Sequence, residues 1–222
     1  MKRLLLLRHA ATSATRAAAF PADEPLDERG AGDAAALRSC LPVRPGEILT
    51  SPATRCRQTA EAAGLTPARS EPALAECDFG AWAGDTLTRL HAADAAAVSE
   101  WMADADAAPH GGESLRRFAA RVAGWLDAQA AGDGRATAVT HGGVVKAAVV
   151  HALGAPLDAF WRIDVAPLSV TELHAHDGRW TLTRVNATPA VGSGAPSASS
   201  GAPSADVPAL IGGAASKRGG PA

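Results

Sequence analysis

Short apolar runs that end abruptly in polar or ionisable residues recur along the chain. The first covers residues 4–7, four leucines in a row, and runs directly into Arg8 and His9. Apolar runs of this length are typical of strands that are buried on both faces, as in parallel sheets. Strands or extended segments are predicted at residues 4–7, 48–50, 68–74 and 137–140.

The pattern between these strands changes to that of amphipathic helices. The clearest helix starts near residue 115, where apolar side chains recur at i, i+3, i+7, i+10 and i+11. These side chains are Leu115, Phe118, Val122, Trp125 and Leu126. The arginines of the same segment lie off this stripe and are expected to form a solvated face: Arg116, Arg117 and Arg121.

Capping signals place two earlier helices. Asp27 is a favourable N-cap for a helix that extends to about Leu41. Ser51 and Pro52 predict another helix start, with serine as the N-cap and proline in the first turn, and Gly64 is a natural stop. Two further helices are expected at residues 82–109 and 144–153.

Alternating strands and helices predict an α/β fold. Two final strands, at residues 169–175 and 180–185, flank a turn and predict a hairpin. We expect residues 1–186 to form a three-layer α/β/α sandwich with a mostly parallel sheet. Residues 187–222 are rich in Ala, Gly, Pro and Ser, and such a segment is expected to be a disordered tail.

The overall composition narrows the classes of function. The 222-residue chain has a formal net charge of −2, so no basic excess is available to bind a nucleic-acid backbone. Three cysteines, an odd number without CxxC spacing, favour a reducing cytosol. No apolar run approaches the roughly 18 residues that a membrane span needs. We expect a cytoplasmic protein whose partner is neither a nucleic acid nor a membrane, and the pattern predicts no particular oligomeric state.

Ionisable side chains follow each of the predicted parallel strands. They are Arg8 and His9 after the first strand, Arg55 in the first turn of the helix after the second, Glu76 after the third and His141 after the fourth. Right-handed crossovers place the C-terminal ends of parallel strands at one edge of the sheet, where ligands bind in open α/β folds. We therefore expect these side chains to converge.

This set of residue types suits a phosphoryl group. Two guanidinium groups offer forked donors that match phosphate oxygens, and the turn at Gly142 and Gly143 presents backbone N–H groups at a helix start. One neutral histidine can attack phosphorus while the other donates to an equatorial oxygen. Glu76 is the only carboxylate at a predicted strand end that can protonate an alkoxide leaving group.

Five motifs occur in the order seen in a known family. Together they resemble the histidine phosphatase superfamily, also called the phosphoglycerate-mutase-like family, over essentially the whole predicted domain. The motifs are Arg8-His9-Ala10, Ser51-Pro52-x-x-Arg55-x-x-Gln58-Thr59-Ala60, Leu74-x-Glu76-x-x-Phe79-Gly80-x-Trp82-x-Gly84, Gly111-Gly112-Glu113-Ser114 and Thr140-His141-Gly142-Gly143.

The resemblance implies a role for individual residues. His9 would form a phosphohistidine, and Glu76 would act as the proton donor and acceptor. Arg8, Arg55 and His141 would bind the phosphoryl group. The family uses no metal or organic cofactor, so none is expected here.

The chain departs from the family pattern at two positions near its start. Ala10 replaces the glycine of the usual Arg-His-Gly motif, which is the smallest possible change. Thr15 stands where an asparagine usually contacts phosphate, and we expect its hydroxyl to make a similar contact.

Two further departures favour a phosphatase over a mutase. Cys77-Asp78-Phe79 replaces the Arg-x-Tyr that helps mutases hold the phosphoglycerate carboxylate. Only about thirty residues separate Gly80 from Gly111, where mutases carry a long insertion. The resemblance therefore favours a small-molecule phosphatase, similar to the branch that includes α-ribazole phosphatase.

Three other functions remain open on the sequence alone. They are a mutase of the same fold, a phospho-ligand binding module whose catalysis has decayed, and a metallohydrolase. His174 and His176 would share one face of a strand and permit a metal pair, but no third ligand is evident, so no metal site is expected.

Overall fold

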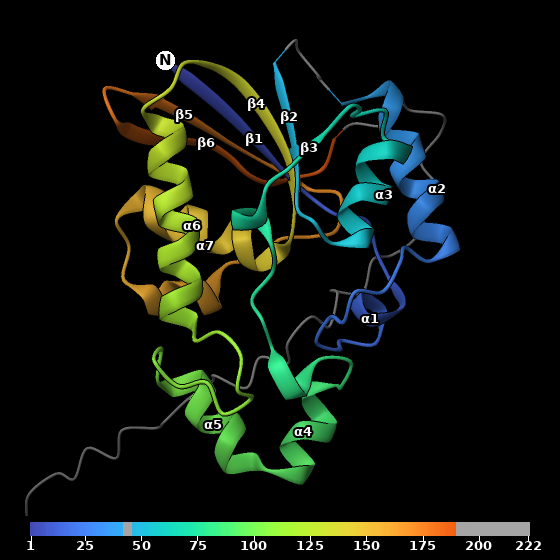
Figure 1. Cartoon of the computed structure of the whole chain (residues 1–222), viewed down its shortest axis with the longest axis vertical. Coiled ribbons are helices and arrows are strands. Elements are labelled where there is room, and N and C mark those ends of the chain that lie inside the picture. Colours follow the sequence, from blue (N-terminus) through green and yellow to red (C-terminus); the bar gives the residue numbers. More distant parts are fainter. Residues whose placement is uncertain (42–45, 190–222) are drawn as a thin grey trace, which may run out of the picture.

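The sheet has six strands in the order β3-β2-β4-β1-β5-β6 (Figure 1). The computed structural model describes residues 1–41 and 46–189. Its strands are β1 (Lys2–Arg8), β2 (Glu47–Thr50), β3 (Arg69–Ser70), β4 (Gly134–Thr140), β5 (Val170–His176) and β6 (Arg179–Ala187).

The parallel half of the sheet has its strand ends level with one another. β4 lies between β1 and β2 and is parallel to both, and β3 is parallel to β2. Arg8 is paired with Thr140, and Thr50 with Val139, so three strands end at nearly the same height. β5 is antiparallel to β1 and forms the predicted hairpin with β6.

Seven α-helices and four short 3-10 turns are found in the described residues. The α-helices are α1 (Ser13–Arg16), α2 (Glu28–Ala36), α3 (Thr54–Ala62), α4 (Leu87–Ala93), α5 (Ala95–Ala103), α6 (Leu115–Ala130) and α7 (Gly142–Leu153). The 3-10 turns are η1 (Leu37–Ser39), η2 (Pro72–Leu74), η3 (Gly80–Trp82) and η4 (Leu157–Arg162). None of the helices in these residues is both long and apolar enough to cross a membrane.

Two hydrophobic cores cover the two faces of the sheet. Leu4 and Leu6 are fully buried with the apolar stripe of α6 and the apolar residues of α7. Leu7 is fully buried on the opposite face with Val139 and with residues of α3. Figure 1 shows α6 and α7 on one side of the sheet and α2 and α3 on the other. The predicted α/β/α sandwich is therefore confirmed, and alternate leucines of β1 belong to different cores.

A third, aromatic cluster lies beyond the C-terminal ends of the strands. Trp82, Val98 and Trp101 are buried there, with Phe20 and Phe79 packed against them. The helices α4 and α5 project at this end of the molecule, away from the N-terminus (Figure 1). The segment predicted as one helix over residues 82–109 is in fact two short helices, because Asp94 ends α4 and caps α5.

The predicted helix start, with Ser51 as the N-cap, is wrong by two residues. Ser51 continues the extended chain of β2, since its N–H donates to the carbonyl of Val139. Proline disfavours helical geometry in the residue before it, which keeps Ser51 extended. The helix begins at Thr54 with Ala53 as its N-cap.

Smaller differences occur at other element boundaries. The extended segment expected at residues 68–74 is a strand only at Arg69–Ser70, because Pro72 opens η2. Asp27 caps α2 as predicted, but the α-helix ends at Ala36 and continues as η1. β6 runs one residue past the expected boundary at 186, and the predicted tail lies outside the described residues from 190 onward.

Candidate active site

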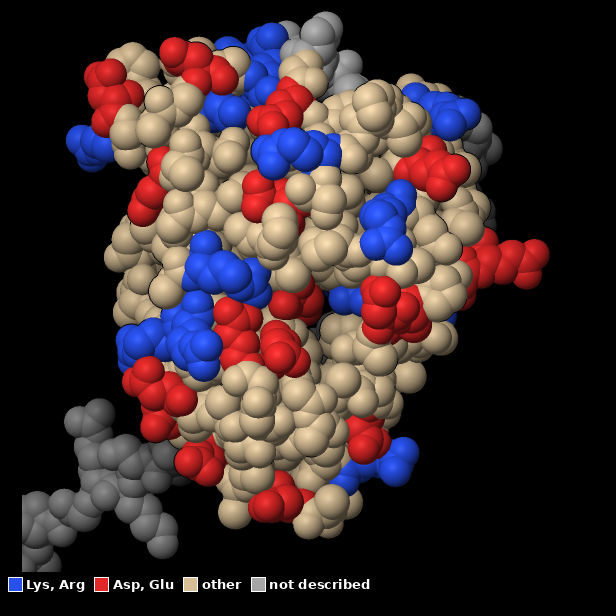
Figure 2. Space-filling view, in the orientation of Figure 1, with Lys and Arg blue, Asp and Glu red and all other residues tan. Residues whose placement is uncertain are grey.

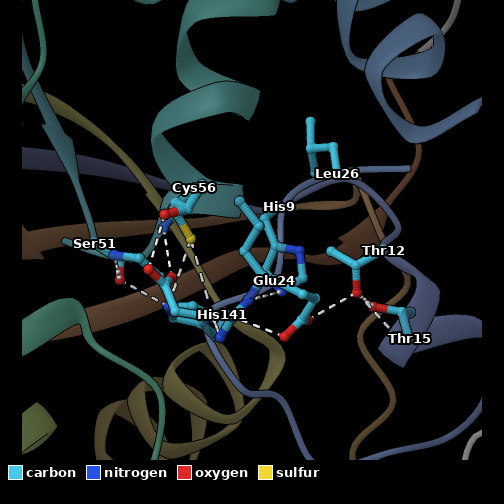
Figure 3. A network of polar contacts seen from close by, with 12 residues as sticks. His9, Thr12, Thr15, Glu24, Leu26, Ser51, Cys56 and His141 are labelled. Carbon is cyan, nitrogen blue, oxygen red and sulfur yellow. Dashed lines mark hydrogen bonds and ion pairs between the residues drawn. The ribbon is translucent and has the colours of Figure 1, made fainter. Parts of the chain in front are cut away.

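His9 and His141 lie side by side at the carboxyl ends of β1 and β4 (Figure 3). Their ring centroids are 5.2 Å apart, with an angle of 68° between the ring planes. Both histidines are buried, with 5% of His9 and none of His141 exposed. Arg55 reaches both rings from the first turn of α3, as the sequence predicts.

The His9 imidazole is held in one tautomer. Its Nδ1 lies 2.7 Å from the carbonyl oxygen of Ala10, which can only accept, so Nδ1 carries the proton. Its Nε2 therefore carries no proton, and the lone pair of this nitrogen accepts a hydrogen bond from Nε of Arg55 at 3.3 Å. Burial, aided by the charges of Arg55 and Arg8, lowers the pKa of His9 from 6.5 to about 3, against a smaller opposing effect of the Ala10 hydrogen bond. A neutral imidazole with a lone pair on Nε2 is a suitable nucleophile.

The His141 ring is fixed by two partners on different elements. Nη2 of Arg55 donates to its Nδ1 at 3.1 Å, and its Nε2 lies 2.7 Å from the hydroxyl oxygen of Ser51. Burial is the main cause that lowers the pKa of His141 well below its usual value. The sequence predicts Ser51 as a helix cap, and its Ser-Pro context gives no sign of the contact with histidine.

Cys56 packs against the same imidazole without being reactive. Its Sγ lies 3.5 Å from Nε2 of His141. Burial raises the pKa of this thiol to about 12, so the sulfur remains protonated. Cys56 therefore contributes shape rather than a thiolate.

The two arginines supply the positive charge of the site. Only 4% of Arg55 is exposed. Arg8 donates through Nη1 to the carbonyl of Val165, and its guanidinium lies over Gly142, where a β-carbon would come within 3.4 Å of Nε. Two guanidinium groups beside two neutral imidazoles form a site for an anion.

A polar chain joins Thr15 to this site. The hydroxyl of Thr15 lies 3.1 Å from that of Thr12, and Thr12 donates to Glu24 at 3.0 Å. The other carboxylate oxygen of Glu24 is 4.0 Å from Nη1 of Arg55. Glu24 was not expected here, because it lies in a loop with no motif or strand end to indicate it (Figure 3).

Glu76 lies against the N-terminus of α7. Its carboxylate accepts from the backbone N–H of Cys77 at 3.0 Å and from that of Gly143 at 3.2 Å. A β-carbon at position 143 would lie 2.2 Å from Oε1 of Glu76, so only glycine allows this approach. Gly142 is the first residue of α7 and comes directly after His141, as predicted.

Arg121 is not the solvated residue that the α6 pattern predicts. Its side chain is 28% exposed, it pairs with Glu113, and it donates to the backbone carbonyl of Glu76. Periodicity alone misses this role because a long side chain can lie beside a stripe and still reach across to a loop.

Charged residues also surround a pocket that lies beside Glu76. An open pocket of about 340 Å³ beside Glu76 is bordered by Asp78, Glu113 and Arg117. Figure 2 shows acidic side chains near the middle of the face that it draws, with basic ones beside them.

The described residues hold no group of three or more histidine, cysteine or acidic side chains that could bind a metal. His174 pairs instead with Glu172, at a distance of 2.9 Å.

Comparison with protein families gives a match over most of the chain. The model of the histidine phosphatase superfamily (branch 1) matches residues 4–188. The Bifunctional protein Rv2228c of Mycobacterium tuberculosis is 33% identical over 197 residues, which cover 84% of this chain and 54% of that protein. The chain thus spans about half the length of such relatives. A glucosyl-3-phosphoglycerate phosphatase of Mycolicibacterium vanbaalenii is 34% identical over 173 residues, covering 71% of this chain and 77% of the relative.

Solved structures with the same fold include other phosphatases. A putative α-ribazole-5'-P phosphatase from Escherichia coli superimposes with a TM-score of 0.75 and 27% identity, covering 85% of this chain and 98% of that one. A mycobacterial glucosyl-3-phosphoglycerate phosphatase in complex with inorganic phosphate superimposes with a TM-score of 0.73 and 30% identity, covering 85% of this chain and 98% of that one. These similarities agree with an anion site at the sheet edge.

Proposed function

Because the chain belongs to the histidine phosphatase superfamily, we propose that it hydrolyses small-molecule phosphomonoesters through a phosphohistidine on His9. The observation that carries this proposal is the orientation of the His9 ring. The Ala10 carbonyl holds the proton on Nδ1 at 2.7 Å, and Nε2 faces the guanidinium of Arg55. The nucleophilic nitrogen of His9 therefore lies directly beside the guanidinium that would bind the phosphoryl group.

The first half-reaction transfers the phosphoryl group to the enzyme. Arg8 and Arg55 bind non-bridging oxygens of the substrate, and a bond forms between Nε2 of His9 and phosphorus. The bond from phosphorus to the leaving oxygen breaks, and protonated Glu76 gives that oxygen its proton. A bound dianion also raises the pKa of His141, so that this ring takes up a proton from solvent and its N–H donates a hydrogen bond to a phosphoryl oxygen, with the proton staying on the ring throughout.

The second half-reaction releases inorganic phosphate. Ionised Glu76 takes a proton from water as the water oxygen attacks phosphorus, and the bond between phosphorus and His9 breaks. Glu76 is then protonated again and His9 is neutral again. This sequence needs one nucleophile and one proton carrier, and both are residues of the chain.

The surroundings of Glu76 favour hydrolysis of a phosphomonoester over phosphoglycerate mutation. Where mutases provide a cation for the substrate carboxylate, this chain has Cys77-Asp78-Phe79. The named phosphatase relatives act on phosphorylated small molecules, and we propose a substrate of that class here. Metal independence and a cytoplasmic location stay predictions.

A turnover screen tests this function. The full chain is assayed for phosphate release from sugar phosphates, phosphoglycerates, nucleotides and α-ribazole phosphate, with His9→Ala as the background and with a parallel series in excess chelator. We expect release from at least one ester, loss of it in His9→Ala, and no effect of chelation. Isomerisation of phosphoglycerate faster than its hydrolysis would replace the phosphatase by a mutase, and loss of activity on chelation would contradict the metal-independent mechanism.

A further inference from the structure

The guanidinium of Arg121 holds the chain on which Glu76 lies. Nη1 donates to the carbonyl of Ala73 at 2.8 Å and to that of Ala75 at 3.0 Å, and Nη2 donates to the carbonyl of Glu76 itself at 3.3 Å. These three carbonyls lie within four consecutive residues. Arg121 belongs to α6, a rigid helix whose apolar stripe is buried in the larger core.

Glu113 fixes the orientation of that guanidinium. Its two carboxylate oxygens accept from Nε at 3.1 Å and from Nη2 at 2.8 Å of Arg121. The side chain of Glu113 is 16% exposed. The ring of Phe118, one turn earlier on α6, lies 5.1 Å from the guanidinium carbon. The bidentate ion pair and the contact with the ring hold the guanidinium of Arg121 in a single orientation.

The segment that carries Glu76 has little regular structure of its own. β3 ends at Ser70 and η2 at Leu74, and Glu76 follows outside any helix or strand. The same segment is also held by the Thr140 hydroxyl, which donates to the Leu74 carbonyl at 2.8 Å, and by the Gly143 N–H, which donates to the Glu76 carboxylate at 3.2 Å. The position of the Glu76 backbone therefore depends on the donors of Arg121.

We propose that Arg121 is a positioning residue for the proton donor Glu76, and that Glu113 acts with it by orienting the guanidinium. This inference rests on the proposed function, in which Glu76 protonates the leaving oxygen. A donor displaced by a fraction of an ångström loses more rate with a poor leaving group than with a good one, because a good leaving group departs without a proton. Loss of a merely structural contact would lower the rate equally for both.

Leaving-group dependence is the test. We would measure kcat/KM for 4-nitrophenyl, phenyl and 4-methoxyphenyl phosphate with the wild type, Glu76→Gln, Arg121→Gln, Arg121→Lys and Glu113→Gln. Arg116→Gln is the matched control, since Arg116 lies on the same helix but is exposed and pairs with Asp106. Thermal unfolding of each variant checks the fold.

The expected result is a graded loss. Arg121→Gln should lose on the order of 10- to 100-fold with the methoxyphenyl ester and at most about 3-fold with the nitrophenyl ester, in the same sense as Glu76→Gln. Arg121→Lys and Glu113→Gln should fall between these and the wild type, and Arg116→Gln should match the wild type. If Arg121→Gln does not fold, Glu113→Gln carries the test.

Two results would overturn the inference. The first leaves the proposed role of Glu76 as proton donor intact, and the second rejects that role as well. Equal losses across the three esters in Arg121→Gln and Glu113→Gln, with a steep dependence in Glu76→Gln, would reject the role of Arg121 alone. No leaving-group dependence in Glu76→Gln would reject Glu76 as the donor and with it the role of Arg121.

Discussion

Nε of Arg55 lies 3.3 Å from Nε2 of His9 and donates to the nitrogen that would attack phosphorus. The same guanidinium donates to Nδ1 of His141 at 3.1 Å, so one arginine aligns the lone pairs of both rings. Its charge also disfavours protonation of either ring. A phosphoryl group that binds Arg55 is thereby brought to the nucleophile.

The buried histidines make the stability of the protein depend on pH. The pKa of His9 is lowered to about 3, and that of His141 well below 6.5, so between these values and 6.5 the unfolded chain binds more protons than the folded one. The free energy of unfolding is therefore fully retained above pH 6.5 and falls as the pH drops toward 3. For each histidine, the slope is at most about 1.4 kcal/mol per pH unit.

Urea unfolding of the wild type and of His9→Ala at a series of pH values measures this dependence. The curve of the variant should be less steep between pH 6.5 and 4, by up to the contribution of one histidine. His176→Ala is the control, since His176 is exposed. Equal slopes in the wild type and in His9→Ala would show that His9 is not held neutral by the fold.

Gly143→Ala should separate the proton donor from the rest of the site. The new β-carbon would overlap Oε1 of Glu76, so the carboxylate must move and its N–H contact is lost. We expect kcat for an alkyl phosphate to fall on the order of 100-fold. Gly124→Ala, where a β-carbon meets nothing within 4 Å on α6, should keep full activity and gain about 0.5–1 kcal/mol of stability. Full activity in Gly143→Ala would contradict the placement of Glu76.

Ser51→Ala should weaken binding of phosphate. It removes the partner of His141 Nε2, which lies 2.7 Å away, and leaves a buried polar nitrogen without that hydrogen bond. The free energy of unfolding should fall by about 1–3 kcal/mol, and the inhibition constant of inorganic phosphate should rise about 10-fold. Ser99→Ala, which removes an exposed hydroxyl from α5, is the control. An unchanged inhibition constant would mean that Ser51 does not orient His141.

Glu24→Gln should have the opposite effect on phosphate. The Glu24 carboxylate lies 4.0 Å from Nη1 of Arg55. It therefore competes with a bound anion for the positive charge of Arg55. Removal of that negative charge should lower the inhibition constant of phosphate several-fold, and the gain should shrink as salt is added. Glu28→Gln on the exposed face of α2 should change nothing. Weaker phosphate inhibition in Glu24→Gln would show that the carboxylate assists anion binding.

The sequence predicted the parts of the fold that follow from local pattern. The buried leucines of β1, the stripe of α6 and the terminal hairpin all lie where periodicity placed them. The gathering of His9, Arg55 and His141 at one edge followed from the topology of parallel strands, whereas Glu76 lies six residues beyond the end of β3 and not at a strand end as predicted.

The parts that were missed depend on contacts between distant residues. Arg121 and Glu76 are 45 positions apart, and Ser51 and His141 are 90 apart. No local pattern encodes such pairs. Proline at position 52 gave a misleading helix start because the same Ser-Pro pair serves equally well to end a strand in extended geometry.

The most direct measurement is to trap the phosphoenzyme. The wild type, Glu76→Gln and His9→Ala are mixed with a ³²P-labelled phosphomonoester found in the turnover screen, quenched within milliseconds, and mapped by digestion under alkaline conditions. We predict label that is stable in base and labile in acid, located on the peptide that contains His9 and absent from His9→Ala. Label on another residue, or label retained in His9→Ala, would contradict the proposal that His9 is the nucleophile.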